Sequence, residues 1–246
     1  MSRGKTVWKT RLGVRRAIVS AAVMLLASSV AGCGGEGMPS GVVAQVAGHS
    51  ITKTTLERWI KAQAVMDWES HPKHAAPAGV VPDPSDYAPC VAYLGKSSRR
   101  EGNRPPSDAQ LEVRCRQRYE ALREEALNIL ITFQWIIGEC ARRGIKVTDA
   151  EVRQEYARFN GEKFPHRGEL ENFLRYTGWS EADDKLSLKM DLLYAKLEQK
   201  VGGPQAFVKF IGGFTERWVA RTDCRKEDVV SNCRQYKGKI PHEPRV

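Results

Sequence analysis

The feature that most constrains the fold is a run of apolar residues at helical spacing across the middle of the chain. It starts after Pro105 and Pro106, where Ser107 and Gln110 have the spacing of a capping box, and it stops at Gly144. The stripe steps by three or four residues through Leu111, Cys115, Tyr119, Leu122, Ala126, Ile129, Phe133, Ile136 and Cys140. We expect one helix of about 37 residues, about 55 Å long at 1.5 Å per residue. Its second half is apolar nearly all round, so it should be the buried centre of a domain.

Shorter elements are predicted before this helix. Residues 42–51 are rich in β-branched side chains and are interrupted at Gly48, which predicts a short strand or a hairpin. Thr52 can then cap a helix. Its mostly apolar stripe consists of Leu56, Trp59, Ile60 and Gln63. Residues 69–106 hold seven of the twelve prolines, so we interpret them as a loop or insertion without an element of its own.

Helices are also predicted after Gly144. Thr148 with Glu151 forms a second capping box, and Ser180 can cap a later helix. Between these two helices, residues 167–176 predict a short one that is closed by Gly178. After Pro204, aromatic residues at helical spacing predict a closing C-terminal helix, which the glycines at 212 and 213 would allow to bend. The sequence therefore predicts a mainly α domain over 42–221, followed by a tail over 222–246.

The N-terminus has the pattern of an export signal. Six basic residues precede an apolar run over 17–30, which is too short to cross a hydrocarbon core of about 30 Å. Val30-Ala31-Gly32-Cys33 resembles the bacterial lipobox, in which the cysteine carries the lipid and the chain is cut just before it. We expect a signal peptide over 1–32, lipid on Cys33 and a tether over 33–41, which would place the protein on the extracytoplasmic face of a cell membrane. The alternative is an ordinary signal peptide in which Cys33 is incidental.

Removal of the signal peptide changes the charge argument. The whole chain has 39 Lys and Arg and 29 Asp and Glu, but the six basic residues of the signal leave 33 against 29, a net charge of +4. This mild excess does not indicate nucleic acid as a partner, although it would favour an anionic membrane surface.

The remaining cysteines should lie in a compartment where disulfides persist. Cys224 and Cys233 are nine residues apart in a polar stretch, so a local bridge is the natural pairing. Cys90 and Cys115 would then join the long loop to the long helix. Cys140 lies within an apolar helical stretch and is expected to be a buried, unreactive thiol.

Catalytic, metal and cofactor sites have little support in the sequence. His71 and His74 have no matched ligand nearby, and no phosphate-binding loop, nucleophile elbow or zinc-protease motif occurs. We therefore predict no catalytic residue, metal, cofactor or small-molecule substrate.

A family resemblance follows from the order of these elements. The strand VAQVAGHSIT, a helix, and a long helix ending in GECARRGIKVTDAEVRQEY together resemble the N-terminal domain of SurA and PrsA-type foldases, over roughly Val42 to Val219 apart from the Pro-rich segment. That family consists of extracytoplasmic chaperones, in which a parvulin peptidyl-prolyl isomerase domain often precedes the closing helix. Here Lys200 leads through Gly202, Gly203 and Pro204 directly into the closing helix, so we expect the chaperone module alone.

The resemblance implies a lipid-anchored chaperone that binds unfolded or newly secreted polypeptides. Trp179, Phe210 and Trp218 are the candidates for the surface that contacts such clients, although an aromatic stripe on a closing helix is more often core. Two alternatives stay open, namely a peptidyl-prolyl isomerase with an unrecognised site, and a structural or adaptor lipoprotein with one folded partner.

Overall fold

The computed structural model describes residues 38–70, 72–100 and 106–238 of the chain. The chain divides into two units, Met1–Cys33 and Gly34–Val246, and all described residues belong to the second. The predicted signal peptide, the lipobox with Cys33 and most of the tether therefore lie outside the described residues. The same holds for His71 and for the end of the tail.

The prediction of a mainly α fold is confirmed. The helices are α1 (Lys53–Trp68), α2 (Ala88–Arg100), α3 (Asp108–Arg142), α4 (Asp149–Lys163), α5 (Glu169–Thr177), α6 (Glu181–Val201) and α7 (Pro204–Val219). The four predicted caps are present: the side chains of Thr52, Ser107, Thr148 and Ser180 each accept a hydrogen bond from a backbone N–H three residues later. α7 is continuous through its two glycines.

Three short strands form an antiparallel sheet in the order β2-β1-β3, made of β1 (Val42–Val46), β2 (His49–Thr52) and β3 (Thr222–Cys224). The predicted hairpin turns at Ala47 and Gly48, whose φ angles of 48° and 88° are both positive, as a tight hairpin turn requires. The expected boundary at 221 between the domain and the C-terminal tail was wrong in one respect. β3 pairs with β1, so the start of the predicted tail belongs to the sheet of the domain.

The interpretation of 69–106 as free of elements was also wrong, because α2 lies within it. Pro89 stands in the first turn of α2, where the missing N–H costs no helical hydrogen bond. Between Cys90 and Arg100 the chain has no proline. The proline count of the whole segment therefore concealed a proline-free stretch long enough for a helix.

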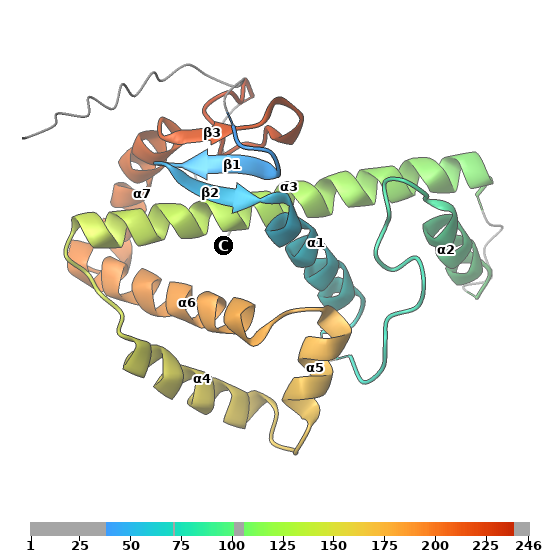
Figure 1. Cartoon of the computed structure of the whole chain (residues 1–246), viewed down its shortest axis with the longest axis horizontal. Coiled ribbons are helices and arrows are strands. Elements are labelled where there is room, and N and C mark those ends of the chain that lie inside the picture. Colours follow the sequence, from blue (N-terminus) through green and yellow to red (C-terminus); the bar gives the residue numbers. More distant parts are fainter. Residues whose placement is uncertain (1–37, 71, 101–105, 239–246) are drawn as a thin grey trace, which may run out of the picture. The chain divides into compact units, whose positions relative to one another are not determined.

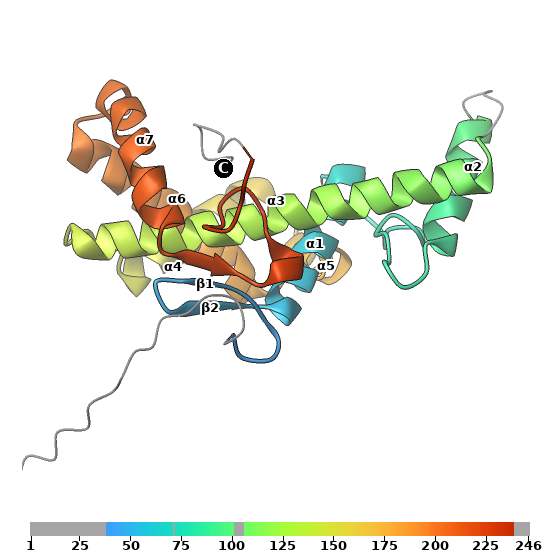
Figure 2. The same cartoon turned by 90° about the horizontal axis from the view of Figure 1, so that it is seen from above.

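α3 is the element around which the second unit is built. Figures 1 and 2 show α3 running between the sheet and α6, with α1 crossing near its middle and α2 beside its N-terminal part. From Ala126 onward its side chains are buried on almost every side, among them Leu127, Ile131, Trp135 and Cys140. Because this half contacts α1, α6 and the sheet, it forms the centre of the core, as its apolar pattern predicted.

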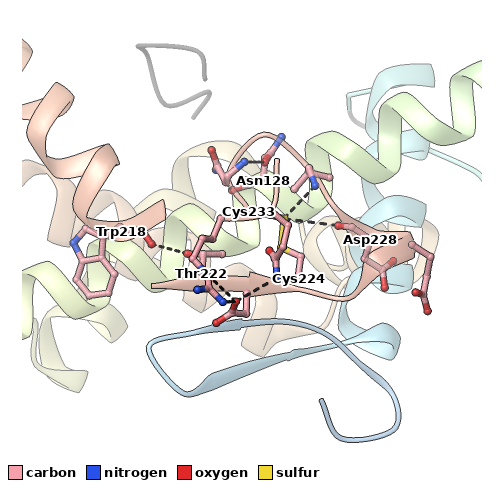
Figure 3. The surroundings of a disulfide bond; sticks show 12 residues. Asn128, Trp218, Thr222, Cys224, Asp228 and Cys233 are labelled. Carbon is pink, nitrogen blue, oxygen red and sulfur yellow. Dashed lines mark hydrogen bonds and ion pairs between the residues drawn. A yellow bond between two sulfur atoms is a disulfide. The ribbon is translucent and has the colours of Figure 1, made fainter. Parts of the chain in front are cut away.

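The segment after β3 is held on α3 by polar contacts. The Asn232 side chain donates to the backbone O of Asn128 and to Thr132 Oγ1, while its backbone N–H donates to Asn128 Oδ1. The indole N–H of Trp135 donates to Thr222 Oγ1 over 2.8 Å. Figure 3 shows this region around the Cys224–Cys233 disulfide.

Candidate binding cavity

A small aromatic cavity lies where α1, α3 and α6 meet. Its volume is about 210 Å³. Three side chains come from α1, three from α3 and two from α6, and Trp179 comes from the turn between α5 and α6. These residues are Trp59, Gln63, Met66, Ile129, Thr132, Phe133, Trp179, Ser187 and Asp191. We call this site the aromatic cavity.

One buried carboxylate positions two sides of the aromatic cavity. Asp183 accepts two hydrogen bonds from the Arg58 guanidinium, at 2.7 and 3.0 Å, and one from the indole N–H of Trp59 at 3.3 Å. It also accepts from Ser180 in the capping box of α6. Burial alone would raise the pKa of Asp183, but the hydrogen bonds from Arg58 and Ser180 outweigh burial and hold the pKa below its ordinary value. Asp183 thus joins α1 to the first turn of α6, directly after Trp179.

The aromatic rings of the cavity are inclined to one another. Trp59 meets Phe133 edge to face, with ring centroids 5.5 Å apart and an interplanar angle of 85°. Trp59 and Trp179 are 5.2 Å apart at 53°. Trp179 also meets Phe173 of α5 nearly at right angles, with ring centroids 6.5 Å apart and an interplanar angle of 87°. Such tilted contacts fix ring positions without stacking the rings flat against each other.

Two polar atoms of the lining residues are buried without a hydrogen-bond partner within the described part of the chain. They are Gln63 Oε1, an acceptor, and Trp179 Nε1, a donor. Buried polar groups in folded proteins are nearly always paired, so an unpaired donor and acceptor in the walls of one cavity fit a ligand that carries both complementary groups.

Asp191 stands at the opening of the aromatic cavity, because it lines the cavity and is exposed to solvent. Loss of hydration next to the protein raises the pKa of Asp191, and the nearby carboxylate of Glu155 raises it further. Asp191 is the one charged side chain among the described lining residues, so the opening is negative wherever this carboxylate is ionised.

A larger and more polar cleft lies between α2 and the N-terminal half of α3. Its volume is about 1210 Å³, and Tyr87, Arg116 and Tyr119 are among its lining residues. Burial raises the pKa of both tyrosines. Tyr119 and Arg123 also line a second hollow of about 430 Å³ beside β1 and α1, so the two depressions adjoin.

The three predicted client-contacting aromatics do not share one surface. Trp179 lines the aromatic cavity, whereas Phe210 is half-buried on α7 with the guanidinium of Arg143 over its ring, 4.7 Å from the centroid. Trp218 is only 4% exposed. Its ring packs against Gly138, so the prediction of Trp218 as a surface contact was wrong. It is a core residue, because the closing helix α7 buries its aromatic stripe against α3.

Glu139, fully buried at the end of α3, is the hydrogen-bond partner of Trp218. It accepts from the indole N–H of Trp218 at 3.2 Å, from Arg142 at 2.7 Å and from Arg143 at 2.6 Å. Burial would raise the pKa of Glu139, but these hydrogen bonds together lower it to about 2. Glu139 is therefore a charged anchor between α3 and α7.

The cysteines of the described residues pair as the sequence predicted. The disulfides Cys90–Cys115 and Cys224–Cys233 are both present. Since Cys90 lies in α2, the first of them joins two helices and not a loop to a helix. Cys140 is buried and unpaired, and burial, with a smaller contribution from Glu139, raises the pKa of its thiol to about 11. A thiol of this kind is unreactive at neutral pH.

Metal-binding clusters and membrane spans are both absent from residues 38–70, 72–100 and 106–238. These ranges contain no group of three or more His, Cys, Asp or Glu side chains arranged to hold a metal ion. None of their helices combines the length and the hydropathy that a membrane span needs. Of the two histidines that were considered as metal ligands in the sequence, His74 is described, and its ring lies edge to face against that of Trp68.

Among the candidates named from the sequence only Trp179 lines the aromatic cavity, and the other lining residues were not candidates. Trp59 and Phe133 were predicted as core stripe residues. Gln63 carried a usable signal, since it is a polar residue in an otherwise apolar stripe. Asp191 gave no signal, because only the packing of α6 on α3 brings it to the cavity.

Comparison of the chain with protein-family models, with curated proteins and with solved structures found no match.

Proposed function

We propose that this protein is a lipid-anchored chaperone of the extracytoplasmic membrane face, which binds unfolded or newly exported polypeptides through the aromatic cavity. The observation that carries the proposal is the cavity itself, with aromatic walls, one unpaired donor and one unpaired acceptor. At about 210 Å³ it is smaller than the roughly 300–1,000 Å³ of typical small-molecule sites. A single side chain of a polypeptide suits this volume better than a whole metabolite.

The expected affinity is compatible with a chaperone. Even the largest apolar side chains, the aromatic ones, bury only about 150–250 Å², so burial of one side chain gains at most about 4–6 kcal/mol at 25 cal/mol per Å² before the costs of association. Those costs consume most of such a gain. One occupied cavity therefore gives weak binding with fast release. A chaperone requires such release, because its clients must leave it in order to fold.

The predicted lipid on Cys33 supports the same proposal. A tether over 33–41 would keep the domain at the membrane face where exported chains emerge. The resemblance to SurA and PrsA-type foldases points to the same class of client. The partners in this proposal are unfolded polypeptides and the membrane, without nucleic acid, cofactor or small-molecule substrate.

An aggregation assay tests the proposal. The soluble domain from Ser40 onward is mixed at equimolar ratio with a reduced, aggregating client protein, and light scattering is followed. We expect suppression by the wild type and a clear loss of suppression in Trp179→Ala. Val208→Ala is the matched control, because Val208 is an exposed apolar residue on α7 that does not line the cavity. Absence of suppression by the folded wild-type domain counts against the proposal.

The isomerase alternative gains no specific support from the geometry. α6 and α7 are joined by Gly202 and Gly203, at the point where family members often carry the parvulin domain. A protease-coupled proline-peptide assay decides the question, since catalysis above background would favour an isomerase.

The adaptor alternative is favoured by one observation, the cleft of about 1210 Å³ between the Pro-rich segment with α2 and the helix α3. Its tyrosines and arginines are residue types enriched in protein interfaces. Recovery of one stoichiometric folded partner, lost on Tyr119→Ala and retained in Trp179→Ala, would favour the adaptor over the chaperone.

A further inference from the structure

The charge at the opening of the aromatic cavity limits which side chain it can hold. Among the described residues that line it, Asp191 alone is charged. Within the described part of the chain no Lys, Arg or His lies within ion-pair distance of Asp191. The charged residue that acts on Asp191 is another carboxylate, Glu155, which is itself paired with Arg158. The carboxylate of Asp191 is thus left without compensation by the protein.

The interior of the aromatic cavity also favours a cation. The faces of tryptophan and phenylalanine rings attract cations, and Trp59, Phe133 and Trp179 are inclined to one another and not stacked. Gln63 Oε1 adds a buried acceptor that lacks a donor. A negative opening, aromatic walls and an unpaired acceptor are all complementary to a positively charged group with N–H donors.

A neutral apolar side chain would leave these groups unsatisfied. It would cover Asp191 and so remove water from a carboxylate without replacing the lost hydrogen bonds, and Gln63 Oε1 would stay unpaired. A basic side chain avoids both costs, because its alkyl stem lies against apolar walls while its head group donates hydrogen bonds. It carries no acceptor, so the acceptor for the unpaired indole N–H of Trp179 would be a backbone carbonyl of the same client chain. Arginine fits better than lysine, since its planar guanidinium has five N–H donors and stacks on aromatic rings.

We infer that the aromatic cavity recognises an arginine side chain of the client polypeptide, with the stem against Trp59 and Trp179 and the guanidinium bound by Asp191 and Gln63. This inference rests on the proposed function and specifies its client. The clients selected by this site are therefore exported chains in an unfolded state that expose arginine next to apolar residues.

Matched peptides test the inference. An unstructured, fluorescently labelled peptide with one arginine among apolar residues is compared with the same peptide carrying citrulline, which has the same shape without the charge. Fluorescence anisotropy with the soluble domain should give about tenfold tighter binding for the arginine peptide. In Asp191→Asn the two peptides should bind within about twofold of each other. Glu124→Gln is the matched control, because it removes one exposed carboxylate of α3 that does not line the cavity, and it should keep the full difference.

The outcomes separate the inference from the proposed function. Equal binding of both peptides to the wild type, or an unchanged preference in Asp191→Asn, overturns the arginine assignment and leaves the chaperone proposal standing. Binding of neither peptide to the folded domain counts against the proposed function itself. Competition by agmatine, a free guanidinium compound, at the same concentration as the peptide would overturn the polypeptide assignment, because the cavity would then be a small-molecule site.

Discussion

The two halves of α3 are held in the fold by different means. Over 108–125 the helix buries Leu111, Cys115 and Leu122 and exposes most of its other side chains, and the Cys90–Cys115 disulfide ties this half to α2. From Ala126 to Cys140 most side chains are buried among α1, α6, α7 and the sheet. The position of residues 108–125 thus depends on a disulfide, and we call them the covalently bridged half of α3. The position of residues 126–142 depends on the burial of apolar side chains, and we call them the buried half.

The two halves also border different cavities. The covalently bridged half borders the large polar cleft, whereas Ile129, Thr132 and Phe133 of the buried half line the small aromatic cavity. A binding site needs fixed walls to select one type of side chain, and the buried half provides them. This contrast is why we place client recognition at the aromatic cavity.

The largest expected effect is removal of the Cys90–Cys115 bridge. Its 25-residue separation corresponds to about 3.5 kcal/mol of loop-closure entropy. In Cys90→Ala/Cys115→Ala we expect α2 to lose protection in hydrogen exchange, while the second half of α3 keeps its protection. Equal loss of protection along all of α3 would contradict the division into two halves.

Glu139→Gln should destabilise the buried half by about 2–3 kcal/mol, because it weakens the charged hydrogen bonds that the buried carboxylate accepts from Arg142 and Arg143 at the end of α3 and from Trp218 of α7. The effect depends on pH. Since the folded-state pKa of Glu139 is lowered from 4.5 to about 2, its contribution is complete above about pH 4.5 and is lost as the pH falls toward 2. Denaturant titrations of the wild type and the variant should therefore converge in acid. A constant difference at every pH would argue against the ionised anchor.

Gly138→Ala should cost about 2 kcal/mol, because a Cβ at Gly138 would lie 2.0 Å from the ring of Trp218. Gly161→Ala in α4 is the matched control, since a Cβ at Gly161 meets no atom within 4 Å and alanine favours helix. Thermal unfolding should show a lower Tm for the first variant and an equal or higher Tm for the second. A similar loss in both would point to a general intolerance of alanine.

The smallest effect is expected at Tyr119, in the covalently bridged half. Its pKa is raised, mainly by burial, so the neutral phenol stabilises the fold below pH 10 and this contribution is lost as the pH rises through the folded-state pKa. Tyr119→Phe should reduce the loss of stability at alkaline pH. It should leave the loss of stability at acid pH unchanged. If the stability at acid pH changed instead, the pH dependence of the two halves of α3 would not be independent.

The elements with local signals were predicted well from the sequence. Ser107, Thr148 and Ser180 mark helix starts because their caps involve residues only three positions apart. β3 was missed because its partner β1 lies almost 180 residues earlier, and no local pattern records such a pairing. α2 was missed because prolines on both sides of it dominated the composition of the segment.

The candidate site was predictable only in part, for the same reason. Trp179 was a candidate because the family resemblance and the aromatic residues of the late helices indicated a client-contacting surface. The aromatic cavity as a whole exists only once α1, α3 and α6 pack together, and Asp191 acquires its place at the opening from that packing alone.

Site-specific photo-crosslinking tests the central claim, that unfolded polypeptide enters the aromatic cavity, most directly. A photoreactive phenylalanine analogue replaces Met66, which lines the cavity, or Val113, which is 49% exposed on the covalently bridged half of α3. We predict crosslinks from position 66 to a carboxymethylated, permanently unfolded client, and few from position 113 or to the same client in its native state. Equal labelling at both positions, or labelling at 113 without labelling at 66, would contradict the claim.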